Sequence, residues 1–162
     1  MGIYYTIQGI NAWIEAQNQG YLVGNKEYVC EDFIRPYQWM MKQMQKRIPD
    51  YNGEYPIWLW PDKQDLRRRG YNERGMKAVY LEIEIPENQV LLSDFQAWHC
   101  VLNDFPLLDH EDEIIDKELS WERIFDLEYL QRHPDWGILD IQVVTGKIDL
   151  NHVKSVRKFT CK

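Results

Sequence analysis

An arginine-rich segment is the first feature of the sequence that could bind a ligand. Residues 61–77 contain six basic and three acidic residues, a net charge of +3 in a 162-residue chain whose net charge is −7. Arg67 and Arg69 lie in this segment, and Gly70 and Gly75 indicate a flexible loop around them. A guanidinium group can bind phosphate through two parallel hydrogen bonds, so this is a candidate phosphate-binding loop. The alternative is a solvated loop whose charges pair with the acidic segment 104–128.

Two tryptophans precede the arginines in residues 55–61, a short segment bracketed by prolines. Prolines at both ends predict a strand at the edge of a sheet. Trp58 and Trp60 are two residues apart, so their side chains would lie on the same face of that strand. Such an aromatic face could stack a nucleobase or a nicotinamide ring. The alternative is that both rings are buried in the core.

Uncharged polar residues on predicted strands are candidates for binding or catalysis. Thr6 and Gln8 share one face of the first predicted strand, and Gln142 lies in the middle of a late one. Because Gln142 is flanked by Ile141 and Val143, its amide needs a hydrogen-bond partner if it is buried. That partner could be a backbone group or the hydroxyl of a ligand.

Several other chemistries lack support in the sequence. The three cysteines are far apart and the four histidines lack the spacing of zinc ligands, so we expect neither a disulfide framework nor a metal site. The nucleophile elbow, the P-loop and the Gly-x-Gly-x-x-Gly motif are all absent. There is no apolar run of about 18 residues and no secretory leader pattern. We therefore expect a cytoplasmic protein that is not associated with a membrane.

The hydrophobic pattern predicts that these residues are held by one α+β domain spanning 1–162. Residues 3–8 predict a strand, and Asn11 would cap a short helix that ends at Gly20. The clearest helix carries an apolar stripe from residue 33 to residue 48, with Asp32 as its cap. Residues 78–85 alternate apolar and polar side chains, which predicts a half-buried strand. We expect a single compact fold with a mixed or antiparallel sheet and flanking helices.

An acidic segment lies in the second half of the chain. It follows a predicted strand at 90–92 and a helix whose capping box would be Ser93 and Gln96. Residues 104–128 contain ten acidic and two basic residues, a net charge of −8, on the solvated side of a predicted amphipathic helix. Strands are expected at 138–144 and 156–159, with Asp149 capping one helical turn between them.

Short motifs along the chain resemble those of an uncharacterised bacterial family, domain of unknown function 3841. The resemblance extends from Tyr4 to Phe159 and implies no reaction. The motifs that carry it are Tyr5-Thr6-Ile7-Gln8 with Trp13, Gly20-Tyr21-Leu22, Tyr55-Pro56-Ile57-Trp58-Leu59-Trp60, Asp65-Leu66-Arg67, Leu91-Leu92-Ser93-Asp94-Phe95 with Trp98-His99, Leu102-Asn103, and Ser120-Trp121-Glu122-Arg123-Ile124-Phe125-Asp126.

The order of the first and last elements has a more distant resemblance to ADP-ribosyltransferase-like domains. The resemblance implies a cleft that binds NAD, with Thr6 in the place of a His or Arg and Gln142 in the place of a catalytic Glu. Around the cofactor it implies Gln8, the tryptophans 58 and 60, and the arginines 67 and 69. An amide at position 142 can bind a ribose hydroxyl, but it cannot offset the positive charge that develops in the transition state.

Three functions are consistent with these features. The first is an ADP-ribosyltransferase-like domain that binds or processes NAD or another nucleotide. The second is a non-catalytic protein-interaction module that uses the acidic segment 104–128. The third is an enzyme that processes RNA or phosphate groups with the arginine loop. Duplex nucleic acid is disfavoured as the main partner, because the chain as a whole is acidic.

Overall fold

The computed structural model describes all residues, 1–162, as an α+β domain whose strands form three small antiparallel sheets. The helices are α1 (Ile10–Gln19), α2 (Ile34–Arg47), α3 (Phe95–Leu102), α4 (Lys117–Trp121) and α5 (Leu127–Arg132). The strands are β1 (Gly2–Gly9), β2 (Tyr21–Leu22), β3 (Ile57–Leu59), β4 (Lys77–Ile85), β5 (Leu91–Asp94), β6 (Ile141–Thr145), β7 (Ile148–Asp149) and β8 (Val153–Thr160). No helix is both long enough and apolar enough to cross a membrane.

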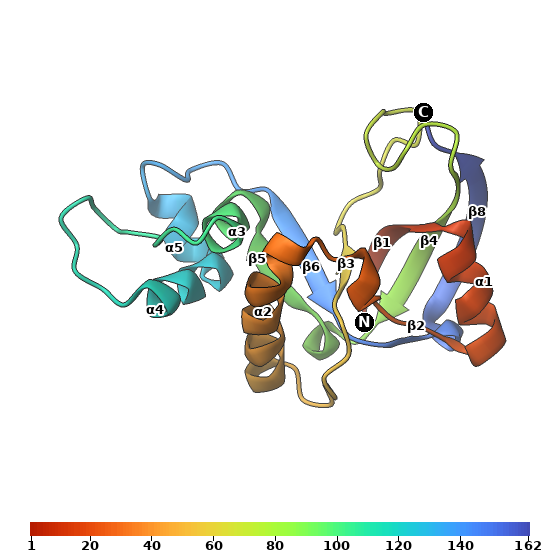
Figure 1. Ribbon diagram of the computed structural model, residues 1–162, viewed down its shortest axis with the longest axis horizontal. Helices are drawn as coiled ribbons and strands as arrows, with labels where there is room; N and C mark the ends of the chain where they lie inside the picture. Colours follow the sequence, from red (N-terminus) through yellow and green to blue (C-terminus); the bar gives the residue numbers. More distant parts are fainter.

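The first sheet has the order β1–β4–β8 and carries one of two apolar clusters. Strand β4 alternates as predicted, with Val79, Leu81 and Ile83 completely buried on the face that α1 covers. Helix α1 ends as predicted at Gly20, whose backbone N–H bonds to the carbonyl of Ala16 in the left-handed conformation (φ 90°). This sheet and α1 form one end of the molecule (Figure 1).

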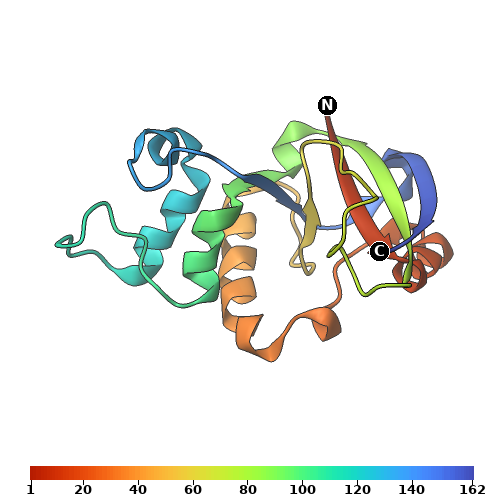
Figure 2. The ribbon, with the colours of Figure 1, turned by 90° about the horizontal axis from the view of Figure 1, so that it is seen from above.

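The second sheet has the order β3–β6–β5, so β3 lies at an edge, as its prolines predict. Helices α2 and α3 bring Met40, Met44, Trp98 and Val101 into the second apolar cluster. In Figures 1 and 2 this sheet lies between the β1–β4–β8 sheet and the helices α3, α4 and α5. A third sheet contains only the short strands β2 and β7.

The two larger sheets are separate because β1 and the residue that follows β3 meet at a single bridge. Tyr5 and Trp60 exchange two backbone hydrogen bonds, of 2.9 and 2.8 Å, and no other residue pair continues the ladder between these strands. The two larger sheets therefore separate on one side of this bridge.

Several predicted helix ends differ in the structure. Gly9 rather than Asn11 precedes α1, and a 3₁₀ turn at Glu31–Phe33 displaces Asp32 from the start of α2. Asp94 caps α3 instead of Ser93: the Asp94 carboxylate accepts from the N–H of Ala97 at 2.8 Å, whereas the Ser93 hydroxyl accepts from the side-chain amide of Gln142. The acidic segment 104–128 contains the short helix α4 and a 3₁₀ turn at Glu122–Phe125, and α5 begins at its end; the late strand begins at 141 rather than 138. The Asp149 cap is confirmed by its bond from the N–H of Asn151.

Candidate functional site

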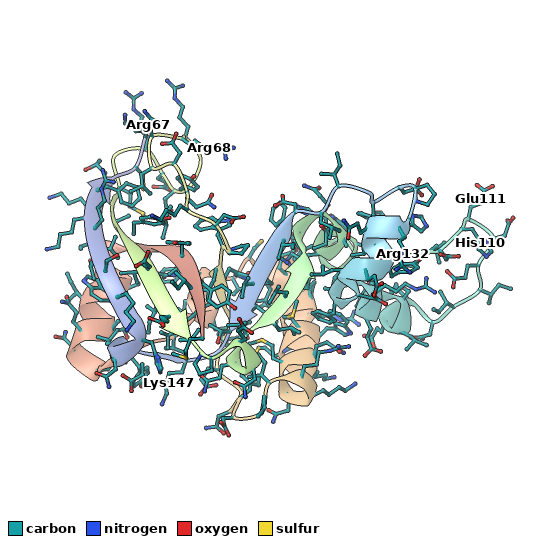
Figure 3. The ribbon with its side chains drawn as sticks, turned by 180° about the vertical axis from the view of Figure 1, so that it is seen from behind. Arg67, Arg68, His110, Glu111, Arg132 and Lys147 are labelled. Carbon is teal, nitrogen blue, oxygen red and sulfur yellow. The ribbon has the colours of Figure 1, made fainter.

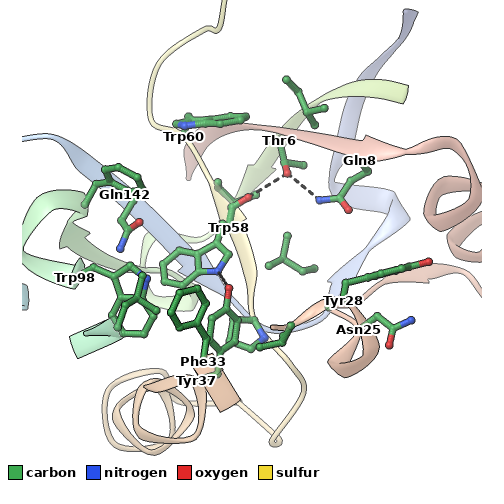
Figure 4. A pocket seen from close by; sticks show the side chains of 18 of the residues that line it. Thr6, Gln8, Asn25, Tyr28, Phe33, Tyr37, Trp58, Trp60, Trp98 and Gln142 are labelled. Atoms are coloured by element: carbon green, nitrogen blue, oxygen red, sulfur yellow. Dashed lines mark hydrogen bonds between the residues drawn. The ribbon is translucent and has the colours of Figure 1, made fainter. Parts of the chain in front are cut away.

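A cleft of about 660 Å³ opens between the two larger sheets and holds most of the polar and aromatic residues singled out from the sequence. Thr6 and Gln8 reach it from β1, Trp58 and Trp60 from β3 and the residue that follows it, and Gln142 from β6. Figure 4 shows Gln142 and Trp98 on one side of the cleft and Gln8 on the other, with Trp58 between them.

Three aromatic side chains form the central wall of the cleft. The indole N–H of Trp58 donates to the Tyr37 hydroxyl at 2.9 Å, and the Trp58 ring lies 5.5 Å from the ring of Trp98. Burial raises the pKa of Tyr37 above its ordinary value, which keeps the hydroxyl protonated and able to donate. Trp58 is half-buried and also packs against the second apolar cluster, so it serves the core and exposes an aromatic face to the cleft.

Thr6 and Gln8 form a linked pair at the β1 wall. Thr6 is 1% exposed, and its hydroxyl donates to the carbonyl of Trp58 at 3.0 Å while it accepts from the Gln8 amide at 2.9 Å. Because its only proton is already used, Thr6 cannot donate to a ligand in this arrangement. Gln8 keeps a second amide proton and its carbonyl oxygen, so it is the member of the pair that can bind one.

Gln142 is nearly buried, and its protein partner is a side chain. Its amide nitrogen donates to the hydroxyl of Ser93 at 3.0 Å, across the β5–β6 pairing, rather than to the backbone group that was one of the two predicted alternatives. Its carbonyl oxygen receives no hydrogen bond from the protein, and no buried side-chain oxygen or nitrogen of the chain is without a partner. That oxygen is therefore accessible at the cleft and can accept a hydrogen bond from a ligand hydroxyl or amide.

The two predicted phosphate-binding arginines point to different places. Arg67 does not line the cleft: its exposed side chain binds Asp65 through bonds of 2.9 and 3.1 Å, and these bonds lower the pKa of Asp65 to about 2. Arg69 lines a neighbouring hollow together with Arg68, and Trp60 and Asp140 are shared between that hollow and the cleft. Arg69 is therefore the better placed of the two to reach a ligand in the cleft.

No lysine or arginine lines the cleft itself, and its ionisable side chains besides tyrosine are Asp140 and His99. The His99 Nδ1 lies 2.9 Å from the carbonyl oxygen of Phe95, which assigns the proton to that nitrogen and leaves Nε2 as an acceptor in the neutral ring. Nowhere in the chain do three or more His, Cys, Asp or Glu side chains gather as ligands for a metal ion.

The sequence interpretation missed the wall formed by residues 24–33. Gly24 lets this segment pass against the backbone that precedes β3, because a Cβ at this position would lie 2.4 Å from the carbonyl oxygen of Pro56. Asn25, Tyr28 and Phe33 reach the cleft as a result. The segment has no hydrophobic periodicity, and the glycine is the only sign of the close approach in the sequence.

The fold is that of an α+β domain whose main cleft is lined by aromatic rings and hydrogen-bonding side chains. Residues 3–117 match the model of the family described as Domain of unknown function (DUF3841), and the chain belongs to that family. The match includes most of β1, all of β3 and the arginine-rich segment 61–77, and it ends before Gln142. Neither the curated proteins nor the solved structures contain a match to the chain.

Proposed function

We propose that the chain binds a nucleotide in this cleft, as an ADP-ribosyltransferase-like domain would bind NAD. The observation that carries the proposal is the convergence of Gln8, Trp58, Trp60 and Gln142 from three strands on one cavity. A cavity of about 660 Å³ lies within the range of small-molecule and cofactor sites, which combine apolar walls with a few polar groups.

The wall contacts suggest how such a ligand would lie. The half-buried ring of Trp58 would hold a planar ring, while the amide groups of Gln8 and Gln142 would bind ring substituents or ribose hydroxyls. Trp60 stands at the boundary with the hollow of Arg68 and Arg69, so a phosphate attached to the ribose would extend toward these two guanidinium groups.

The proposal is limited to binding, with NAD as the first ligand to test. Gln142 occupies the position at which the resemblance implies a glutamate, and an amide supplies no negative charge to a developing cation. Asp140 is the only carboxylate that lines the cleft, and it lies at the junction with the arginine hollow.

Thermal unfolding with and without ligand tests the proposal. NAD, ADP-ribose or AMP should raise the melting temperature, since a ligand at about 100 times its dissociation constant stabilises the folded state by about 2.7 kcal/mol. Arg69→Ala should reduce the shift for phosphorylated ligands and leave that for adenosine unchanged. Arg67→Ala is the matched control and should preserve both shifts, because Arg67 points away from the cleft. No shift with any of these ligands would overturn the proposal.

A second candidate function is a protein-interaction module built on the acidic segment 104–128. The observation in its favour is a set of apolar side chains exposed among the acids: Ile114 is 99% exposed, Phe105 64% and Leu119 56%. A pull-down with wild-type chain and with a variant neutralised at Asp109, Glu111 and Asp112 tests this function. A partner that binds both forms equally would contradict it.

A further inference from the structure

Two basic segments that are far apart in the sequence lie side by side at one end of the molecule. Residues 61–77 have six basic and three acidic residues, and residues 153–162 have four basic residues and no acid. Backbone hydrogen bonds of 2.8 and 2.9 Å join Gly75 and Met76 to Cys161. The two segments together carry +7, whereas the rest of the chain carries −14. We call residues 61–77 and 153–162 the basic face.

The charges of the basic face are largely free. All ten of its lysines and arginines are exposed, and only Arg67 and Lys154 form ion pairs, with Asp65 and Glu84. No ion pair joins this face to the acidic segment 104–128, whose basic residues and carboxylates pair elsewhere. Figure 3 shows Arg67 and Arg68 at one end of the molecule and the acidic loop at the other.

Aromatic rings lie among these charges in two hollows. The first, of about 410 Å³, lies between the loop and the outer face of the first sheet, where the rings of Tyr5 and Tyr80 stack 5.8 Å apart. The charged side chains that line the same hollow are Lys63, Arg67 and Arg157, together with Asp65 and Glu82. The second hollow, of about 670 Å³, holds Trp60 and Tyr71 with the arginines 68 and 69, and it shares Trp60, Asp140 and Ile141 with the cleft between the two larger sheets.

We propose that the basic face binds single-stranded nucleic acid, whose path runs from the Tyr5–Tyr80 hollow past Arg68 and Arg69 to the cleft. Proteins that hold single strands combine positive charge along the backbone with aromatic rings that stack on unpaired bases, and both features occur here. A duplex would offer no free base to rings that line hollows. Only the last step, a terminal nucleotide in the cleft, rests on the proposed function.

Fluorescence anisotropy with a labelled single strand of about 12 nucleotides, as RNA and as DNA, tests the inference. With about four phosphate contacts, the affinity should fall about 50-fold between about 50 and 200 mM salt. The double variant Lys63→Glu with Arg157→Glu should weaken binding at least about tenfold. The matched control, Arg132→Glu with Lys147→Glu, makes the same change in net charge away from the basic face and should retain near wild-type affinity (Figure 3).

Three results would overturn the inference: no binding at about 50 mM salt, equal losses in the two double variants, or a poly-glutamate peptide that competes as well as the oligonucleotide. The last result would indicate an acidic protein partner instead. The nucleotide-induced melting shift separates the two proposals. If the chain binds the oligonucleotide but its melting temperature does not shift with free nucleotides, the basic-face proposal stands and the cleft proposal fails. The opposite result contradicts only the basic-face proposal.

Discussion

The hydroxyl of Thr6 joins two walls of the cleft, because it donates to the backbone carbonyl of Trp58 at 3.0 Å while it accepts from the side-chain amide of Gln8 at 2.9 Å. The first bond ties β1 to β3 beside the single bridge between those strands. The second sets the direction of the Gln8 amide. Thr6 is therefore a positioning residue, and the contact with a ligand falls to Gln8.

Thr6→Val should lower the free energy of unfolding by about 1–3 kcal/mol, because a buried site loses both hydrogen bonds while the side chain keeps its shape. Nucleotide affinity should fall as well, since Gln8 loses its tether. Urea unfolding and the ligand-induced melting shift measure the two effects. Thr160→Val, on the exposed face of β8, is the matched control and should change neither. Equal effects in the two variants would contradict the assigned role.

Gly24→Ala should destabilise the chain by about 1–3 kcal/mol, because its new Cβ would lie 2.4 Å from the carbonyl oxygen of Pro56 and 2.6 Å from that of Tyr55. Backbone atoms cannot move aside as a flexible side chain can. Gly137→Ala is the control: its nearest neighbouring atom lies 4.0 Å away, and we expect a change of less than about 1 kcal/mol. Thermal unfolding of the two variants measures the difference, and similar melting temperatures would refute the close approach.

The parts of the fold that follow from local pattern were predictable from the sequence. The alternation in β4, the glycine that ends α1 and the prolines around β3 each act through residues next to one another in the chain. The cap of α3 was not predictable in this way, because Ser93 and Asp94 are adjacent and both can cap. Side-chain contacts decide the matter: the Ser93 hydroxyl accepts from the Gln142 amide, and the Asp94 carboxylate accepts from the N–H of Ala97.

The site was predictable only as a set of residue types. Polar and aromatic residues on strands indicated the cleft, but the choice among the consecutive arginines 67–69 depends on the path of the loop. That path is set by distant contacts, such as the bond from the N–H of Gln64 to the Tyr80 hydroxyl, and by Gly70 in the left-handed conformation (φ 95°). Neither the bond between Gln64 and Tyr80 nor the conformation of Gly70 produces a periodic pattern in the sequence that would give the path of the loop.

The acidic segment should respond to pH through Glu113. Two hydrogen bonds from Arg123, of 2.5 and 2.7 Å, are the main reason why the pKa of Glu113 is lowered from 4.5 to about 2. A lowered pKa stabilises the fold at a pH above the ordinary value, and this stabilisation is lost as the pH falls from about 4.5 to about 2.

Glu113→Gln should therefore unfold at a lower temperature than wild type near neutral pH, and the two melting temperatures should converge as the pH falls toward 2. Thermal unfolding followed by circular dichroism across this range measures the convergence. Glu111→Gln removes the charge of an exposed neighbour without an ion pair, so it should track wild type at every pH. A constant difference between Glu113→Gln and wild type would exclude the ion pair as the cause.

Asp94→Ala should affect both stability and the cleft, because one buried carboxylate serves two elements. Its Oδ2 accepts from the N–H of Ala97 at 2.8 Å and caps α3. Its Oδ1 accepts from the N–H of Asp140, also at 2.8 Å, just before the strand that carries Gln142.

Asp116→Ala is the matched control, since the exposed Asp116 caps α4 through one bond from the N–H of Leu119 and does not line the cleft. A cap alone is worth about 1 kcal/mol, so chemical unfolding should give about 1 kcal/mol for Asp116→Ala and about 2–4 kcal/mol for Asp94→Ala. Only Asp94→Ala should also diminish the nucleotide-induced melting shift, because the loss of the Asp140 bond frees the end of β6. If both variants lost the same stability and kept the full shift, Asp94 would be a cap and nothing more.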